Sequence, residues 1–221
     1  LHNPAHSFPT RRSSDLGEAV AVPLDVTDEQ SVLDCVAKAE AALGALEVVV
    51  SGAGDLAVGR SFEQPVEQFT DQINIHLNGA YRLYRAVIPG MIERARGDFV
   101  FIGSDVTQRP RTFSSAYVAA KSGIDGLVTT VQMELEGTGV RAGLVRPGQT
   151  LTGMGMDLDQ KTTEDMLNDW IKFGIARHGN FLSPEHIAQA IAGMIGMPRG
   201  AHMRIVEVEA EGAVPKAKRS Q

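Results

Sequence analysis

The chain contains a single cysteine, Cys35, among its 221 residues. One cysteine excludes a framework of internal disulfides, and it is the usage expected of a protein from a reducing cytoplasm. Cys35 lies in a stretch with helical apolar spacing. We therefore interpret it as a core-filling residue rather than as a nucleophile.

Metal-ligand clusters, long apolar runs and excess positive charge are also missing. The six histidines, at positions 2, 6, 76, 178, 186 and 202, do not build a set of zinc ligands, so we expect no metal site. No apolar run reaches the length of a transmembrane helix. The net charge is -6 and no basic stripe is present, so neither nucleic acid nor an anionic membrane is an expected partner.

The residues that are present alternate between strand and helix patterns. The length suffices for one α/β domain, and the alternation predicts a doubly wound parallel sheet. A capping box at Thr27 and Gln30 opens the first helix. Pro89-Gly90 is expected to bend the second, and 149–182 is a long excursion with helical pieces. The expected strands are 19–24, 46–50, 99–102, 140–145 and 203–208, and the later helices are 66–95, 117–136 and 184–195.

The first residues do not follow these patterns. Residues 6–16 have no hydrophobic period, and they resemble the in-frame translation of a sequencing-library adapter. The alternative is a natural polar leader. We expect residues 1–16 to be a non-native or disordered leader and 17–221 to form a single domain.

Three polar residues carry the chemical signal. Ser104 ends an apolar strand, and Tyr117 and Lys121 lie four residues apart in the next helical pattern, on one helix face. An ammonium beside a phenol lowers the phenol pKa, so Tyr117 is expected to act as a general acid or base near neutral pH. The alternative is an ordinary surface pair.

Together with a Pro147-Gly148 turn after the next apolar run, these residues resemble the short-chain dehydrogenase/reductase family over roughly residues 17–221. The resemblance implies a Rossmann-like doubly wound sheet. It also implies that the first βαβ unit with its glycine-rich turn is missing, about 45 residues in all. The sheet is then expected either to have a gap or to rearrange.

The resemblance assigns further positions to a nicotinamide cofactor. Asp25 and Val26 match the strand end that contacts adenine, although an aspartate before any helix looks the same. Ser51, Gly52 and Ala53 stand where the family has Asn-Asn-Ala, and a plain turn is the alternative. The expected contacts with the nicotinamide end come from Tyr117, Lys121, Pro147, Gly148, Thr150 and Thr152.

His76 occupies the place of the family asparagine that completes a catalytic tetrad. It either keeps the proton relay to Lys121, with a charge near neutral pH, or is only a packing residue. Residues 149–182 match the family's substrate lid, while helical core is the plainer interpretation of their apolar residues. Arg109 and Arg111 face a substrate anion or, as we expect, a solvated loop.

The resemblance therefore implies an NAD- or NADP-dependent oxidoreductase that interconverts an alcohol and a ketone, with Tyr117 as general acid/base, Ser104 holding the oxygen and Lys121 bonding the ribose. NAD and NADP are not distinguishable. An apolar substrate, a cytoplasmic location and a homodimer or homotetramer are expected. The alternatives are an inactive truncated fragment, a non-catalytic nucleotide-binding member of the fold, and an epimerase or dehydratase.

Overall fold

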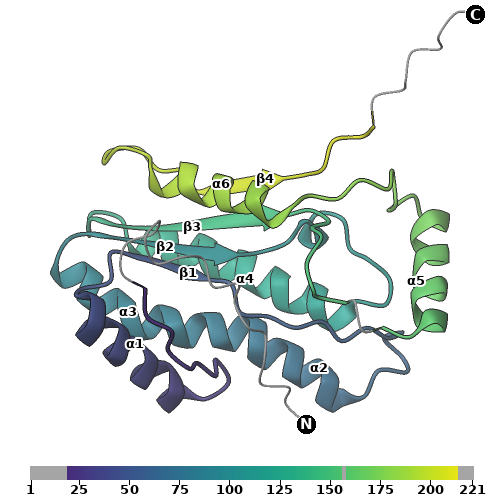
Figure 1. The fold of residues 1–221 in the computed structure, drawn as a ribbon, viewed down its shortest axis with the longest axis horizontal. Helices are drawn as coiled ribbons and strands as arrows, with labels where there is room; N and C mark the ends of the chain where they lie inside the picture. Colours follow the sequence, from purple (N-terminus) through teal and green to yellow (C-terminus); the bar gives the residue numbers. More distant parts are fainter. Residues whose placement is uncertain (1–18, 156–157, 214–221) are drawn as a thin grey trace, which may run out of the picture.

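The computed structural model describes residues 19–155 and 158–213, and Figure 1 shows a parallel sheet with helices on both faces. The predicted leader, residues 1–16, and most of the polar tail lie outside the described residues. The strands follow one another in the sheet in chain order, and each pair is parallel. They are β1 (Val48–Ser51), β2 (Gly97–Ile102), β3 (Val140–Pro147) and β4 (Ile205–Val208).

Alternate residues of β2 build the two cores. Phe99 and Phe101 pack on one face against α3 (Gly79–Glu93) and α4 (Ser115–Glu134). Val100 packs on the other face with α6 (Pro184–Ile195). A parallel strand covered on both faces has no polar side, which explains its continuous apolar run. The helix α1 (Glu29–Leu43) lies against α3, and α5 (Gln160–Lys172) stands at the side of the molecule in Figure 1.

The strand predicted at 19–24 is wrong. This segment has no strand structure and is mostly exposed. A strand needs a neighbour to pair its backbone groups, and β1 pairs only with β2 in the described part of the chain. The sheet therefore ends at β1, whose Val48 and Val50 are each 42% exposed. The four described strands form one contiguous sheet, so neither expected alternative, a gap or a rearrangement, is seen among them.

The helix predicted at 66–95 changes its winding at a different place from the one expected. It consists of α2 (Val66–Ile73), a π-helical turn η2 (Asn74–Asn78) and α3. Pro89 lies inside α3, so it does not break the helix. The wider turn holds His76, which is buried. Inserted π-helical turns are frequent at functional sites.

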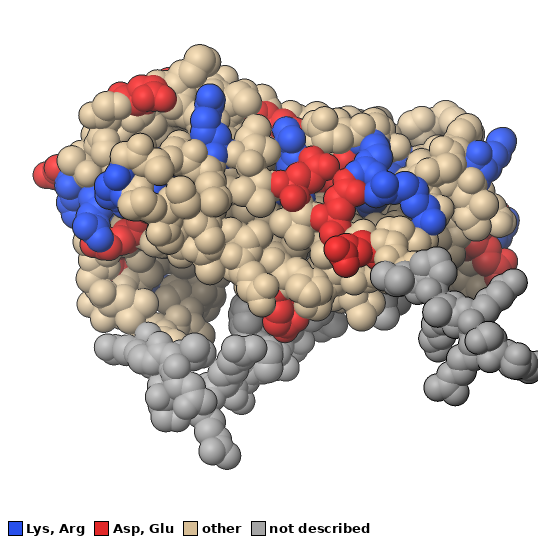
Figure 2. Space-filling model, turned by 90° about the horizontal axis from the view of Figure 1, so that it is seen from above, with Lys and Arg blue, Asp and Glu red and all other residues tan. Residues whose placement is uncertain are grey.

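Two smaller features complete the fold. Asp28, not Thr27, caps α1 by accepting a hydrogen bond from the Gln30 N–H, while Thr27 bonds Asp25. Figure 2 shows acidic and basic side chains in small mixed groups on the face that carries α6 and β4. Among the described residues, no helix combines the length and the apolar character needed to cross a membrane.

Candidate active site

A cavity of about 510 Å³ opens beyond the carboxyl ends of the first three strands. Val50, Ile102 and Pro147 line it at the ends of β1, β2 and β3. This edge is where parallel α/β sheets bind ligands. All four residues predicted to be catalytic line the same cavity: His76, Ser104, Tyr117 and Lys121.

Ser104 is placed by the turn that follows β2. It caps the short 3₁₀ turn η3 (Asp105–Thr107) by accepting a hydrogen bond from the Val106 N–H. Its own hydroxyl donates to Asp105 Oδ1 at 3.2 Å. Ser104 and Tyr117 line the same cavity. Because the turn fixes its backbone, the hydroxyl is held at the cavity wall beside the phenol.

Lys121 lies one turn after Tyr117 on α4, as the spacing predicts. Its Nζ donates to the Ile102 carbonyl at 2.8 Å and lies 5.5 Å from the centre of the Tyr117 ring. Burial lowers the pKa of Lys121 from 10.5 to about 8, although the Asp125 carboxylate opposes this. A charged lysine that is only 5% exposed loses most of its hydration, so burying Lys121 costs free energy of folding.

The expected lowering of the Tyr117 pKa is not found in this structure. Burial raises that pKa, and the nearby Ser104 hydroxyl and the positive charge of Arg111 oppose the rise. Lys121 is not among them, because its Nζ is turned to the Ile102 carbonyl. Desolvation of a phenolate outweighs a cation that is not bonded to it. Tyr117 is therefore neutral near pH 7.

His76 is 2% exposed, and its ring meets the Tyr117 ring edge-on with centroids 5.1 Å apart. Nε2 lies 2.6 Å from the Asp55 carbonyl oxygen and 3.4 Å from the Asp55 nitrogen, and the shorter contact requires a proton on Nε2. Burial first, and then the charge of Lys121, lowers the pKa of His76 to about 4. The expectation of a charge near neutral pH is therefore wrong.

Nδ1 of His76 is buried and makes no hydrogen bond within the described chain. Gly54 leaves just enough room for the ring, since a Cβ there would lie 2.5 Å from Cε1. The histidine is thus a neutral, tightly held ring with one free acceptor. The sequence indicated the position of His76 but not its environment. Gly54 and Asp55, which follow β1, contact a ring that lies in η2, and no local pattern predicts this contact.

The positions predicted to hold a cofactor divide into two groups. Gly52, Tyr117, Lys121, Pro147, Gly148, Thr150 and Thr152 line the cavity. Ser51 and Ala53 do not line it. Val26 packs against Gly79, and its carbonyl accepts from Arg82, while Asp25 bonds Thr27. Neither Asp25 nor Val26 lines the cavity. The segment before them is not part of the sheet, so it does not bring them to the sheet edge where the cavity lies.

Arg111 was expected in a solvated loop, and this is wrong. Its side chain is 14% exposed and lines the cavity, where it pairs with Asp105. Its guanidinium carbon lies 5.4 Å from the Trp170 ring centroid. Asp105 was also missed, although its place directly after Ser104 was a usable signal. Arg109, two residues earlier, is more exposed and pairs with Glu209.

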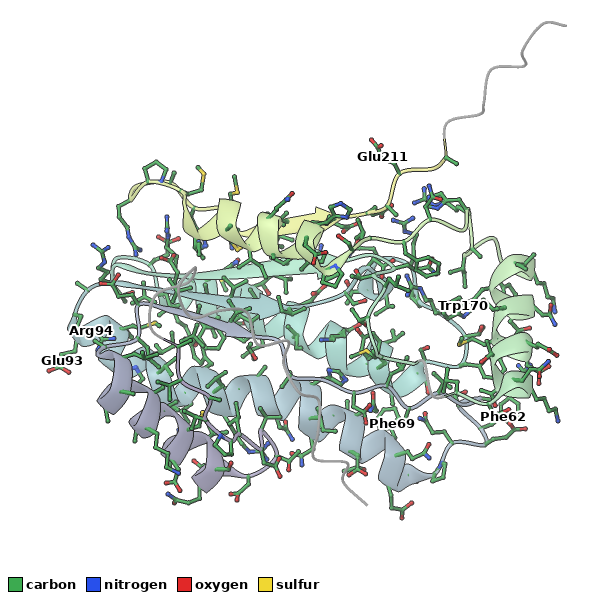
Figure 3. All side chains as sticks on the ribbon, in the orientation of Figure 1. Phe62, Phe69, Glu93, Arg94, Trp170 and Glu211 are labelled. Carbon is green, nitrogen blue, oxygen red and sulfur yellow. The ribbon has the colours of Figure 1, made fainter. Side chains whose placement is uncertain are left out.

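The segment 149–182 contributes its apolar residues unequally. Met166 and Trp170 of α5 line the cavity, and Figure 3 shows Trp170 on the side of α5 that faces the sheet. Leu167, Ile171 and Phe173 are exposed instead. The segment thus closes one side of the cavity with some of its apolar residues and exposes others.

Two expectations concern residues outside the cavity. Cys35 is half-buried on α1. Within residues 19–155 and 158–213, no group of three or more His, Cys, Asp or Glu side chains is arranged to hold a metal ion.

Comparisons with known proteins match the chain to dehydrogenases and reductases. A family model described as short chain dehydrogenase matches residues 5–163. The inactive 2-(S)-hydroxypropyl-CoM dehydrogenase 2 of Xanthobacter autotrophicus is 32% identical over 81% of this chain and 79% of its own length. The 3-oxoacyl-(acyl-carrier-protein) reductase FabG of Thermotoga maritima is 30% identical over 76% of this chain and 66% of its own.

The fold has close neighbours among solved structures. The alcohol dehydrogenase of Thermococcus sibiricus, solved with 5-hydroxy-NADP, superposes with a TM-score of 0.70 at 26% identity, covering 88% of this chain and 75% of that chain.

Proposed function

The chain belongs to the short-chain dehydrogenase family, and on that premise we propose that it is an NAD- or NADP-dependent oxidoreductase that interconverts an alcohol and a ketone. The observation that carries the proposal is the convergence of Ser104, Tyr117 and Lys121 on one cavity at the carboxyl edge of the sheet. Three residues from two separate segments supply an oxygen-binding hydroxyl, a proton donor and a cation there.

The cavity fits the nicotinamide end of such a cofactor. Gly52 and Gly148 line it, and Ile102, Ile187 and Ile191 give an apolar surface for a flat ring. Lys121 uses one donor on Ile102, so its ammonium keeps donors for ribose hydroxyls. When bound, the nicotinamide supplies or accepts the hydride, and the protein supplies orientation and the proton.

The roles of the protein residues follow from their environments. Tyr117, whose pKa burial raises, carries its proton near pH 7, and this is the form that donates to a ketone oxygen in the reductive direction. The Ser104 hydroxyl, now donated to Asp105, turns to the substrate oxygen by rotation about one bond. His76, neutral and bonded to Asp55, offers only an acceptor, so its part in a proton relay is through hydrogen bonding rather than charge.

The proposal extends to assembly and location. Val66 and Met133, on α2 and α4, are 75% and 67% exposed. Large apolar side chains exposed on these two helices support a homodimer or homotetramer that uses them. The single cysteine supports a cytoplasmic location.

The test is hydride transfer followed by the absorbance of the reduced nicotinamide, with a panel of small apolar alcohols and ketones. Tyr117→Phe is expected to lower turnover at least about 100-fold while cofactor binding persists, because it removes only the proton. Tyr81→Phe, an exposed tyrosine on α3, is the matched control and should retain turnover. Equal turnover of Tyr117→Phe and wild type would refute the role of Tyr117.

A second candidate, an inactive fragment or a nucleotide-binding protein without turnover, is favoured by the edge of the sheet. β1 is half exposed, and it pairs only with β2 among the described residues. The relative from Xanthobacter is itself named inactive. Titration of the chain with NADH or NADPH, read by cofactor fluorescence, separates the cases. Binding with no hydride transfer supports the binding protein, and no binding at all supports the inactive fragment.

A further inference from the structure

The charged side chains that line the cavity are both cationic. Arg111 and Lys121 line it, and no aspartate or glutamate is among the described lining residues. His76 adds no charge to the cavity near pH 7, because its pKa is lowered to about 4. Asp105, which pairs with Arg111, lines a neighbouring cavity of about 40 Å³ that shares Arg111 and Gly148 with the larger one. Two cations in a site with low-dielectric walls attract an anion, although Asp105 offsets part of the charge of Arg111.

Arg111 holds unused hydrogen-bonding capacity. Asp105 is its one hydrogen-bond partner among the described residues, and only one Nη makes that bond. Nε is buried and makes no hydrogen bond. Buried donors are nearly always paired, so an unpaired guanidinium nitrogen is a reason to look for a ligand. The planar fork of Arg binds a carboxylate through two parallel hydrogen bonds.

The position of Arg111 suits a substrate group rather than the cofactor. Its guanidinium rests against Trp170, on the lid side of the cavity. Leu56, Val106 and Met166 provide apolar wall in the same cavity. Asp105 accepts hydrogen bonds from both Ser104 and Arg111, so the cation lies near the Ser104 hydroxyl. Lys121 lies deeper, against the end of β2.

We propose that Arg111 determines specificity by binding a carboxylate on the substrate, so that the enzyme acts on small keto or hydroxy acids. This inference rests on the proposed function, because it names the substrate class of the same site. Asp105 holds one Nη of Arg111 from behind, and the carboxylate takes the donors that Asp105 leaves free.

The experiment measures binding, which does not depend on turnover. Trp170 is the single tryptophan of the chain and lines the cavity, so its fluorescence reports an occupant. The probes are acetoacetate and levulinate, each compared with its methyl ester, which keeps the ketone and removes the charge. Titrations are run with and without NAD⁺, and the melting temperature is recorded in parallel.

The acids are expected to bind the wild-type chain at least about tenfold more tightly than their esters, since a charge-assisted bidentate contact is lost in the ester. Arg111→Gln should remove this preference, and Arg111→Lys should retain only part of it, because lysine has the charge without the fork. The matched control is Arg109→Gln, which removes a cation two residues away that pairs with Glu209. It should keep the preference.

Equal binding of acid and ester by the wild-type chain would overturn the inference, and this comparison needs no variant to fold. Loss of the preference in Arg109→Gln as well as in Arg111→Gln would overturn it too. Acid-selective binding without hydride transfer to NAD⁺ or NADP⁺, or from NADH or NADPH, supports the inference and counts against the proposed function, so the two failures are distinct.

Discussion

Replacing His76 with asparagine should remove a pH-dependent part of the stability. The pKa of His76 falls from 6.5 in the unfolded chain to about 4 in the folded protein, because burial and the Lys121 ammonium disfavour the imidazolium. Between these values the unfolded chain binds the proton and the folded protein does not. The stability from this group is therefore complete above pH 6.5 and is lost as the pH falls toward 4.

The size of the effect follows from linkage. The full shift corresponds to about 3 kcal/mol, and about 2 kcal/mol of it should be lost between about pH 7.5 and about pH 5. The geometry supports a large value, since the ring is fixed between the Asp55 carbonyl, the Tyr117 ring and Gly54 and cannot turn to water. The Asp55 carbonyl and carboxylate raise the pKa of His76, but burial and Lys121 lower it by more.

The assay is urea unfolding followed by the fluorescence of Trp170, for wild type and His76→Asn, at several pH values from about 5 to about 7.5. Other titrating groups affect both proteins and cancel in the difference. That difference should change by about 2 kcal/mol across the range, with the wild type losing more stability on acidification. A difference that stays constant, or that moves in the other direction, would refute the buried, neutral histidine.

Two further changes test the same packing. Gly54→Ala should destabilise the protein by about 1–3 kcal/mol, because its Cβ would overlap the His76 ring. Gly153→Ala, where no atom lies within 4 Å of the new Cβ, should be nearly neutral, and similar melting temperatures for the two variants would contradict this. Burial lowers the pKa of Lys121 from 10.5 to about 8, so its contribution to stability is full above pH 10.5 and is lost as the pH falls through about 8. Lys121→Met should remove the rise in unfolding free energy between about pH 8 and about pH 9.5. If urea titrations show that the unfolding free energy of the wild type and of Lys121→Met rises equally over this range, the prediction is contradicted.

The sequence predicted the position of the candidate catalytic residues more reliably than their protonation. The spacing of Tyr117 and Lys121 predicts a shared helix face, and both residues do line the cavity with Ser104. The lowered pKa of Tyr117 and the charged His76 were wrong, because each expectation considered one neighbour and left out desolvation. Desolvation depends on all the segments that close around a group.

What the sequence determined by itself is local. Apolar runs bounded by turns locate β2 and β3, and helical spacing locates α4 and α6, because these signals lie within a few residues of one another. Only the tertiary structure decided that 19–24 forms no strand, that the winding of the long helix changes at Asn74–Asn78, and that Arg111 lies against Trp170. Strand pairing and burial are set by partners far away in the chain, and no local pattern contains them.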